Sequence, residues 1–363
     1  MEHPANSIIA VNNGLLHVPS GQLMAHTHRY FSRNTLPFDY DPKAPAPVAF
    51  LAFLESIWPE YGVPPKEAEA NRQNKATLQE IMGHLLTGET KYQRIFLLVG
   101  ASRGGKGVLT RLFAKMLGAT NVVFVAATKF GTSFGLAGLI GKRLVVMPDF
   151  RLGRGTQNTP LIIERLLSIS GEDSMSVDRK FLPDWEGKLP LNIVLASNMQ
   201  VAFPDQAGAL LNRLIVLVFK KSFADNPDVT LEGRLEAELP SILNWSLDGL
   251  RRLDARVDDR GRPLGFIAPP AGETVLRSIA RRGSTVRAFL DEICTIGRSE
   301  RVAKDALFES FEEWLQDNDL EDHYTEATFA KELFDASAYR VESKRLRVDG
   351  AQVQHYVGVS IRG

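Results

Sequence analysis

Five short apolar segments alternate with stretches in which apolar residues recur at helical spacing. The apolar segments lie at residues 95–99, 122–126, 144–147, 191–196 and 214–219. Continuous apolar runs of this length are typical of strands that are buried on both faces, and the helical stretches between them predict crossover connections. The pattern therefore predicts an α/β fold in which helices cover both faces of a parallel sheet.

The regions on either side of this core predict further elements. Turn signals within residues 7–45 predict a small β element. Helical spacing occurs at residues 48–58, 76–86, 131–139, 161–169 and 235–253. A polar linker at 254–270 precedes helical patterns at 286–296, 305–315 and 328–334, and then two β-like runs joined at Asp349-Gly350. We expect an N-terminal β-hairpin and helical region at 1–75, the central domain at 76–270 and a C-terminal domain at 271–363.

The first apolar segment of the core ends in a glycine-rich turn that leads into a helical pattern. The turn consists of Gly100, Ala101, Ser102, Arg103, Gly104, Gly105, Lys106, Gly107 and Val108. Glycines let several backbone N–H groups converge on phosphates, and the helix start and the Lys106 ammonium add positive charge. This is the pattern of a P-loop, or Walker A loop, and predicts nucleotide binding. The position after the lysine usually holds a Mg²⁺-binding hydroxyl but is Gly107 here, which leaves Thr110 or water as alternative ligands.

Polar residues follow two of the other apolar segments. Asp149 follows residues 144–147, where a carboxylate can bind Mg²⁺ beside a nucleotide. ATPase motifs of this kind usually carry a second acid next to the first, and this chain lacks it, so the catalytic base stays open between Glu164 and Glu172. Asn198 follows the fourth segment, where it can hold the lytic water or touch the γ-phosphate.

Composition excludes several classes of protein. The chain has 363 residues, 44% of them hydrophobic, which is ordinary for a globular protein. Lys plus Arg equal Asp plus Glu at 43 each, so any nucleic-acid binding must come from local basic clusters. A single cysteine, Cys294, excludes a disulfide framework. No apolar run reaches the roughly 18 residues of a membrane span, so we expect a soluble, cytoplasmic protein with no membrane partner.

The order and spacing of these motifs resemble those of the superfamily-3 helicases of the AAA+ class, specifically the helicase half of phage, plasmid and poxvirus-type primase-helicases. The resemblance rests on the glycine-rich turn, Asp149, the segment ISGEDSMSVDRKF at 169–181, Ser197-Asn198 and Arg213. It implies an AAA+-like P-loop NTPase fold and ATP and Mg²⁺ as cofactors. It also implies a hexameric ring that moves 3′ to 5′ on DNA in the replication of a phage, plasmid or other mobile element, in a bacterial or phage-infected cell.

The resemblance also assigns roles to individual residues. The segment at 171–189 is similar to the family's channel hairpin, so that Lys180 matches the lysine that grips single-stranded DNA, with Arg179 and Phe181 beside it. Asn198 matches the sensor residue, and Arg213 matches the arginine finger that reaches the nucleotide of a neighbouring subunit. From the residues alone, a solvated turn at Arg179 and Lys180 is the plainer interpretation.

The C-terminal pattern of three helices and two strands is similar to the winged helix-turn-helix domain of phage primase-helicases. Its basic residues gather on or near the expected wing, at Arg340, Lys344, Arg345 and Arg347. The resemblance implies that they bind DNA, and the alternative is a basic strand face in water.

Two functions from different classes remain in view. The first is an ATP-dependent DNA helicase that acts on single-stranded and forked DNA. The second is a nucleotide-dependent replication initiator or loader without processive unwinding, whose single acid reflects slow hydrolysis. A nucleotide kinase is a third, distant reading, because it does not account for VDRKF or the C-terminal pattern. The sequence has no polymerase-type carboxylate cluster, so priming is expected to belong to a separate primase partner.

Overall fold

The computed structural model describes residues 7–30, 34–152, 158–198, 208–283, 285–318, 324–337, 340–348 and 351–362. Contacts divide these residues into two compact units. The first runs to Leu276, and the second begins at Arg277 and also includes Gly208. Among the described residues, no helix is long and apolar enough to cross a membrane.

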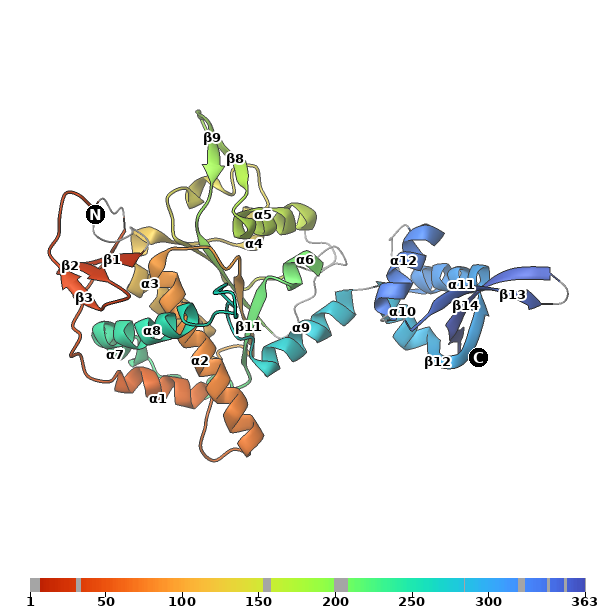
Figure 1. Cartoon of the computed structure of the whole chain (residues 1–363), viewed down its shortest axis with the longest axis horizontal. Helices are drawn as coiled ribbons and strands as arrows, with labels where there is room; N and C mark the ends of the chain where they lie inside the picture. The colour runs from red at the N-terminus through yellow and green to blue at the C-terminus, as the bar shows by residue number, and fades with distance from the viewer. Residues whose placement is uncertain are drawn as a thin grey trace. The chain divides into compact units, whose positions relative to one another are not determined.

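A five-stranded parallel sheet forms the centre of the first unit (Figure 1). Its strands are β5 (Ile95–Gly100), β6 (Val122–Phe124), β7 (Leu144–Met147), β10 (Asn192–Ser197) and β11 (Leu214–Phe219). They lie in the order β11-β5-β10-β7-β6, so that β5 pairs with both β10 and β11. Every residue of β5, β7, β10 and β11 is buried, as expected for strands covered on both faces. The predicted strands and their parallel pairing are confirmed.

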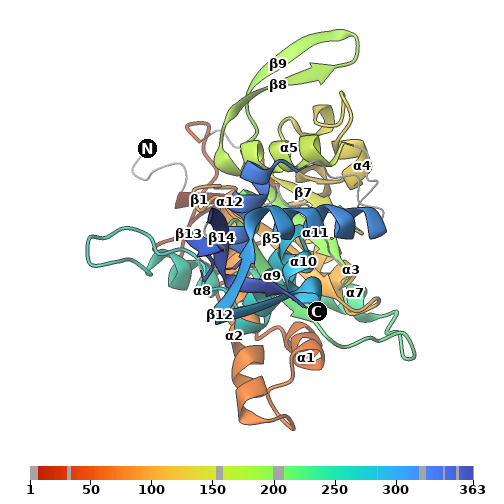
Figure 2. The same ribbon diagram turned by 90° about the vertical axis from the view of Figure 1, so that its right-hand side faces the viewer.

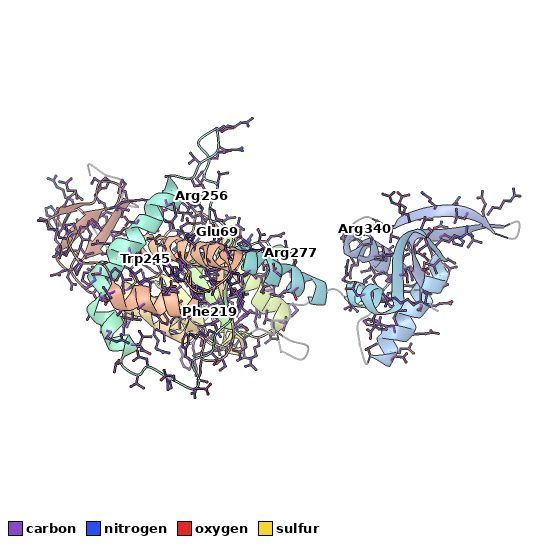
Figure 3. The ribbon with its side chains drawn as sticks, turned by 90° about the horizontal axis from the view of Figure 1, so that it is seen from below. Glu69, Phe219, Trp245, Arg256, Arg277 and Arg340 are labelled. Atoms are coloured by element: carbon purple, nitrogen blue, oxygen red, sulfur yellow. The ribbon has the colours of Figure 1, made fainter. Side chains whose placement is uncertain are left out.

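Helices pack against this sheet. One core cluster joins one face of the sheet to five helices: α1 (Val48–Ile57), α2 (Pro65–Thr87), α3 (Lys106–Leu117), α7 (Leu231–Ala237) and α8 (Leu239–Asp254). On α1 and α8, Phe50 meets Trp245, labelled in Figure 3, edge to face with ring centroids 4.9 Å apart. Helices α2 and α8 pack closely at Gly83. A Cβ at this position would lie 2.3 Å from the Ser246 carbonyl oxygen, so only glycine allows this approach. The described segments also include α4 (Ala127–Phe130), α5 (Thr159–Gly171) and α6 (Gly208–Leu211).

The prediction of a helix at 131–139 is wrong. Residues 131–136 form turns, and only a short 3-10 segment, Ala137–Leu139, follows. Three glycines interrupt the apolar pattern, at Gly131, Gly135 and Gly138, and each disfavours a helix by about 1 kcal/mol relative to alanine. A Cβ on Gly135 would also lie 2.3 Å from the Lys129 carbonyl oxygen.

The N-terminal segment forms the expected small sheet. Its strands are β1 (Ile8–Val11), β2 (Gly14–His17), β3 (Gln22–Met24) and β4 (Thr35–Leu36), in the order β3-β2-β1-β4. Val11 and Leu16 belong to the same core cluster as the central sheet. The N-terminal sheet is therefore part of the first compact unit.

A two-stranded hairpin follows α5. It consists of β8 (Ser174–Arg179) and β9 (Leu182–Lys188), which pair only with each other. The hairpin projects away from the central sheet in both ribbon views (Figure 1 and Figure 2).

The second unit has its own core. Its elements are α10 (Thr285–Ile293), β12 (Cys294–Ala303), α11 (Lys304–Asp317), α12 (Glu326–Ala336), β13 (Glu342–Val348) and β14 (Ala351–Ile361), and α9 (Pro270–Gly283) crosses the boundary between the units. The strands form an antiparallel sheet in the order β12-β14-β13 around which Phe289, Phe311 and Phe329 pack. Cys294 is buried in this core.

The C-terminal prediction needs one correction. The sequence predicts a helix over residues 286–296 and two strands, whereas the helix ends at Ile293 and a third strand, β12, begins at Cys294. Strand β12 lies at an edge of the sheet and carries charged and half-exposed residues. It therefore lacks the apolar run or alternation that would predict a strand. The expected turn at Asp349-Gly350 lies outside the described residues.

Candidate nucleotide site and DNA-contact surfaces

The glycine-rich turn joins the end of β5 to the start of α3. A Cβ on Gly100, where φ is +150°, would lie 1.9 Å from the Phe219 carbonyl oxygen, so that only glycine fits beside β11. Gly105 caps α3 with a φ of +94°, a conformation that favours glycine. The first N–H groups of α3 have no partner within the helix, and together with the helix dipole they suit an anion.

Lys106 lies at the first position of α3 and turns back over this loop. Its Nζ donates to the carbonyl oxygens of Gly100 at 2.8 Å and Ala101 at 2.7 Å. Burial lowers the pKa of the Lys106 ammonium, and the negative charge of Asp149 opposes that shift. The ammonium is thus held at the turn, where a bound phosphate would replace its backbone partners. The Asp149 carboxylate is close enough to favour its charged form.

Asp149 and Asn198 follow neighbouring strands at the same edge of the sheet. Strand β10 lies between β5 and β7, and all three are parallel, so their carboxyl ends meet there. The Phe150 N–H donates to the Ala196 carbonyl at 2.7 Å, and Ser197 Oγ donates to the Phe150 carbonyl at 2.5 Å, which ties the two strand ends together. The structure therefore brings Lys106, Asp149 and Asn198 to one edge, as the sequence predicts.

The residues at this edge fit a magnesium ion held jointly with a nucleotide. Asp149 is exposed there, whereas Thr110 is buried and its hydroxyl donates to the Gly107 carbonyl at 3.1 Å. Among the described residues, no group of three or more His, Cys, Asp or Glu side chains could hold a metal alone. Mg²⁺ at nucleotide sites needs only one or two carboxylates, because phosphate oxygens and waters supply the other ligands.

A cavity of ≈ 570 Å³ opens beside the glycine-rich turn. Its walls include Phe53 and Ala52 of α1, Val108 of α3, and Phe223 and Leu231 beyond β11. The volume lies within the range of about 300–1,000 Å³ that is usual for small-molecule sites. Val108 belongs to the predicted turn, and sequence reasoning missed the other four residues.

The segment beyond β11 is attached directly to the turn. The Phe223 N–H donates to the Arg103 carbonyl at 3.1 Å, and Ser222 Oγ donates to the Ser102 carbonyl at 3.0 Å. At the cavity rim, Arg111 pairs with Glu232 at 2.5 Å, and this arginine holds the pKa of the glutamate below its usual range. The cavity therefore combines apolar walls with a charged rim next to the turn.

Arg213 and Glu172 lie at the opposite, amino edge of the sheet. Arg213 directly precedes β11, and its carbonyl accepts from the Ile95 N–H at the start of β5. The six residues of β11 span roughly 20 Å at about 3.3 Å per residue, so Arg213 cannot reach the glycine-rich turn of its own chain. Glu172 accepts a hydrogen bond from Thr90 near the same edge, which places this candidate base away from the turn.

The Arg213 guanidinium contacts the C-terminal end of α5. Its Nη1 donates to the Leu167 carbonyl at 2.5 Å and to Ser170 Oγ at 2.8 Å. The resemblance implies a side chain that points out of its own subunit, and the described chain instead holds it against α5. Glu164, the other candidate base, is exposed on α5.

The tip of the β8–β9 hairpin presents Lys180 and Phe181. Phe181 is 92% exposed, and Lys180 Nζ lies 5.0 Å from the centroid of its ring. Arg179 turns back instead, since its Nε donates to the Pro183 carbonyl at 2.9 Å. A cation beside an exposed ring suits a nucleic-acid strand, because the ammonium attracts phosphates and the ring can stack on bases.

The basic residues of the second unit lie on or next to β13. Lys344, Arg345 and Arg347 belong to the strand, and Arg340, labelled in Figure 3, precedes it. All four side chains are exposed, and Lys344 pairs with Glu342 at 2.7 Å. The structure therefore gathers the predicted basic cluster around one strand.

Comparisons with known proteins bear on the fold of the chain. A family of unknown function (DUF5906) matches residues 98–213, and a family described as D5 N terminal like matches residues 4–59. The apo structure of the NrS-1 C-terminal region (305–718) has a TM-score of 0.56 and 13% identity, and the match covers 89% of this chain and 78% of that chain. An A-form apo structure of the NrS-1 C-terminal region has a TM-score of 0.53 and 14% identity, covering 88% and 78%. At these identities the likeness shows a shared fold.

Proposed function

We propose that this chain is an ATP-driven DNA helicase of the phage-type primase-helicase class that acts in the replication of a phage, plasmid or other mobile element. The observation that carries the proposal is the meeting of Lys106, Asp149 and Asn198 at one edge of a parallel sheet with strand order β11-β5-β10-β7-β6. The motif resemblance and the match to a D5 N-terminal-like segment support the same class.

The nucleotide site is proposed to use both the turn and the cavity. Backbone N–H groups of residues 100–108 and the Lys106 ammonium bind the phosphates of ATP, and the apolar walls around Phe53 and Phe223 bind the base. Asp149 is the protein ligand for Mg²⁺, which would supply charge neutralisation on the phosphates. Asn198, one strand away from Asp149, holds the attacking water by hydrogen bonding.

The proposal includes a ring of subunits, most simply a hexamer. Arg213 is at the wrong edge of the sheet for its own nucleotide, so as an arginine finger it would act on the nucleotide of a neighbouring subunit. To do so its guanidinium must leave the Leu167 carbonyl and Ser170 Oγ. Head-to-tail contacts give every subunit a complete site only if the assembly closes.

DNA contact is proposed at the hairpin tip and in the second unit. Lys180 and Phe181 would hold single-stranded DNA through phosphate attraction and base stacking, and Arg179 would support the hairpin backbone. The order α10-β12-α11-α12-β13-β14 supports a winged-helix assignment for the second unit, in which Lys344, Arg345 and Arg347 approach duplex DNA.

A second candidate function is a nucleotide-dependent initiator or loader without processive unwinding. It is favoured by the lack of a second acid beside Asp149 and by the location of Glu172 at the far edge of the sheet. Strand displacement on forked DNA with and without ATP separates the two functions. A helicase releases the strand only with ATP and, by resemblance, only on forks with a 3′ tail. DNA binding and ATP hydrolysis without strand release would support the initiator instead.

A further inference from the structure

The charges of the second unit are divided between its helices and its sheet. Helices α11 and α12 together carry eight acidic and two basic residues, a net charge of −6. Strand β13 has three basic residues and one acidic residue. Duplex DNA carries one negative charge per about 1.7 Å of its axis. The acidic helices are therefore poorly suited to lie against it, and β13 is well suited.

The β13–β14 ribbon presents a row of long polar side chains on one face. Arg345 lies opposite Gln354 and Arg347 lies opposite Gln352, and residues opposite each other in an antiparallel pair point to the same side. All four side chains are exposed. In Figure 1 this end of the ribbon extends beyond the helices of its own unit.

The other face of the ribbon has a different character. Lys344 lies opposite His355, which is buried, and Lys344 is paired with Glu342. Leu346 lies opposite Val353, and both are half-buried. The Arg and Gln side chains therefore form the polar, accessible face.

We propose that the β13–β14 ribbon, and not α12, reads duplex DNA in the major groove through Arg345, Arg347, Gln352 and Gln354. This inference rests on the DNA binding proposed above and adds the element and the bases involved. The major groove is about 12 Å wide and admits a two-stranded ribbon, and Arg pairs with the edge of guanine as Gln does with adenine. The ribbon would therefore prefer duplexes that contain both G·C and A·T pairs in a short run.

The test uses the full chain and two kinds of variant. Duplexes are first selected from a random pool with the wild-type protein, and affinities for a selected and an unselected duplex are then measured by fluorescence anisotropy at several salt concentrations. The Gln354→Ala variant should lose about five- to 150-fold in affinity for the selected duplex, the range for one lost base contact. Its affinity for the unselected duplex should not change.

Arg345→Ala should lose about five- to 150-fold in affinity for the selected duplex and relax the preference for it over the unselected duplex. The matched controls are Thr328→Ala and Lys331→Ala on the exposed side of α12, which should bind as wild type. Weaker binding in these controls, with wild-type preference in the glutamine variant, would overturn the inference. So would a loss of single-stranded rather than duplex binding in the ribbon variants.

The inference and the proposed function fail in different ways. A wild-type chain that hydrolyses ATP and unwinds forks, but whose ribbon variants keep the duplex preference, contradicts the ribbon inference alone. A chain that binds neither kind of DNA contradicts both.

Discussion

Arg213→Ala tests whether one arginine both anchors a helix and acts on a neighbouring subunit. In the structure Arg213 Nη1 donates to the Leu167 carbonyl at 2.5 Å and to Ser170 Oγ at 2.8 Å, at the end of α5. A hydrogen bond from a charged group contributes about 1.5–3 kcal/mol when buried, and a cation at a helix C-terminus adds about 0.3–1 kcal/mol. Because these contacts are only partly buried, we expect a loss of about 2 kcal/mol in the free energy of unfolding.

The effect on hydrolysis should be much larger than the effect on stability. An arginine finger accelerates hydrolysis by about 10³- to 10⁵-fold, so Arg213→Ala should bind ATP normally and hydrolyse it at a background rate. Chemical denaturation measures the first effect. A steady-state phosphate-release assay with DNA present, below the unfolding transition, measures the second.

Ser170→Ala is the matched control. It removes one acceptor of the guanidinium and leaves the arginine in place. We expect it to cost about 1 kcal/mol of stability and to retain basal hydrolysis, measured without DNA. Mixing Arg213→Ala subunits with Lys106→Ala subunits should restore some hydrolysis, because some interfaces then pair an intact loop with an intact arginine.

Three results would contradict this reasoning. If Arg213→Ala is destabilised as expected yet hydrolyses ATP at the wild-type rate, the arginine is an anchor of α5 only. If it is inactive and no mixture recovers activity, the arginine does not act across an interface. Light scattering that finds only monomer with ATP and DNA would contradict the ring itself.

Three further predictions test other parts of the molecule. Lys106→Ala and Asp149→Asn should each abolish ATP hydrolysis with unchanged circular dichroism, since both side chains face the proposed phosphate site; near wild-type hydrolysis would exclude that site. Lys180→Ala should keep basal hydrolysis but lose DNA stimulation and strand displacement, and unwinding that survives would make the hairpin tip a surface turn. Burial lowers the pKa of His84 from 6.5 to about 4, so below pH 6.5 the unfolded chain binds a proton that the folded chain does not. The free energy of unfolding should therefore fall between pH 6.5 and 4, by up to about 3 kcal/mol from this group, and His84→Gln should remove that part of the pH dependence in urea unfolding.

The central sheet could be predicted from the sequence because its signals are local. Each strand is a continuous apolar run, and the residues that follow β5, β7 and β10 must meet at one edge if the strands are parallel. That geometry needs no knowledge of the rest of the fold. The β8–β9 hairpin, in contrast, is expected at 171–189 from the resemblance to the family's channel hairpin and not from an apolar pattern.

The cavity and the Arg213 contacts could not be predicted because distant segments create them. Phe53 comes from α1 and Phe223 from the segment beyond β11, and they face one cavity only because the core folds α1 against the sheet. Trp58 Nε1 donates to the Val218 carbonyl at 2.8 Å, which fixes this approach. No local pattern around either phenylalanine indicates the pairing.

The position of Arg213 suggests how a nucleotide could influence the hairpin. The guanidinium lies against Gly171, where an added Cβ would come within 3.1 Å of Nη1, and β8 begins three residues later at Ser174. The Asp173 N–H donates to the Ser168 carbonyl at 3.0 Å, so the hairpin base belongs to the same helix end that Arg213 holds. If the arginine leaves this helix end to reach a neighbour's nucleotide, the base of the hairpin loses two hydrogen bonds at once. Because Ser170→Ala removes only one of them, a variant that keeps basal hydrolysis but loses its stimulation by DNA would place the coupling at this contact, and unchanged stimulation would separate the hairpin from the arginine.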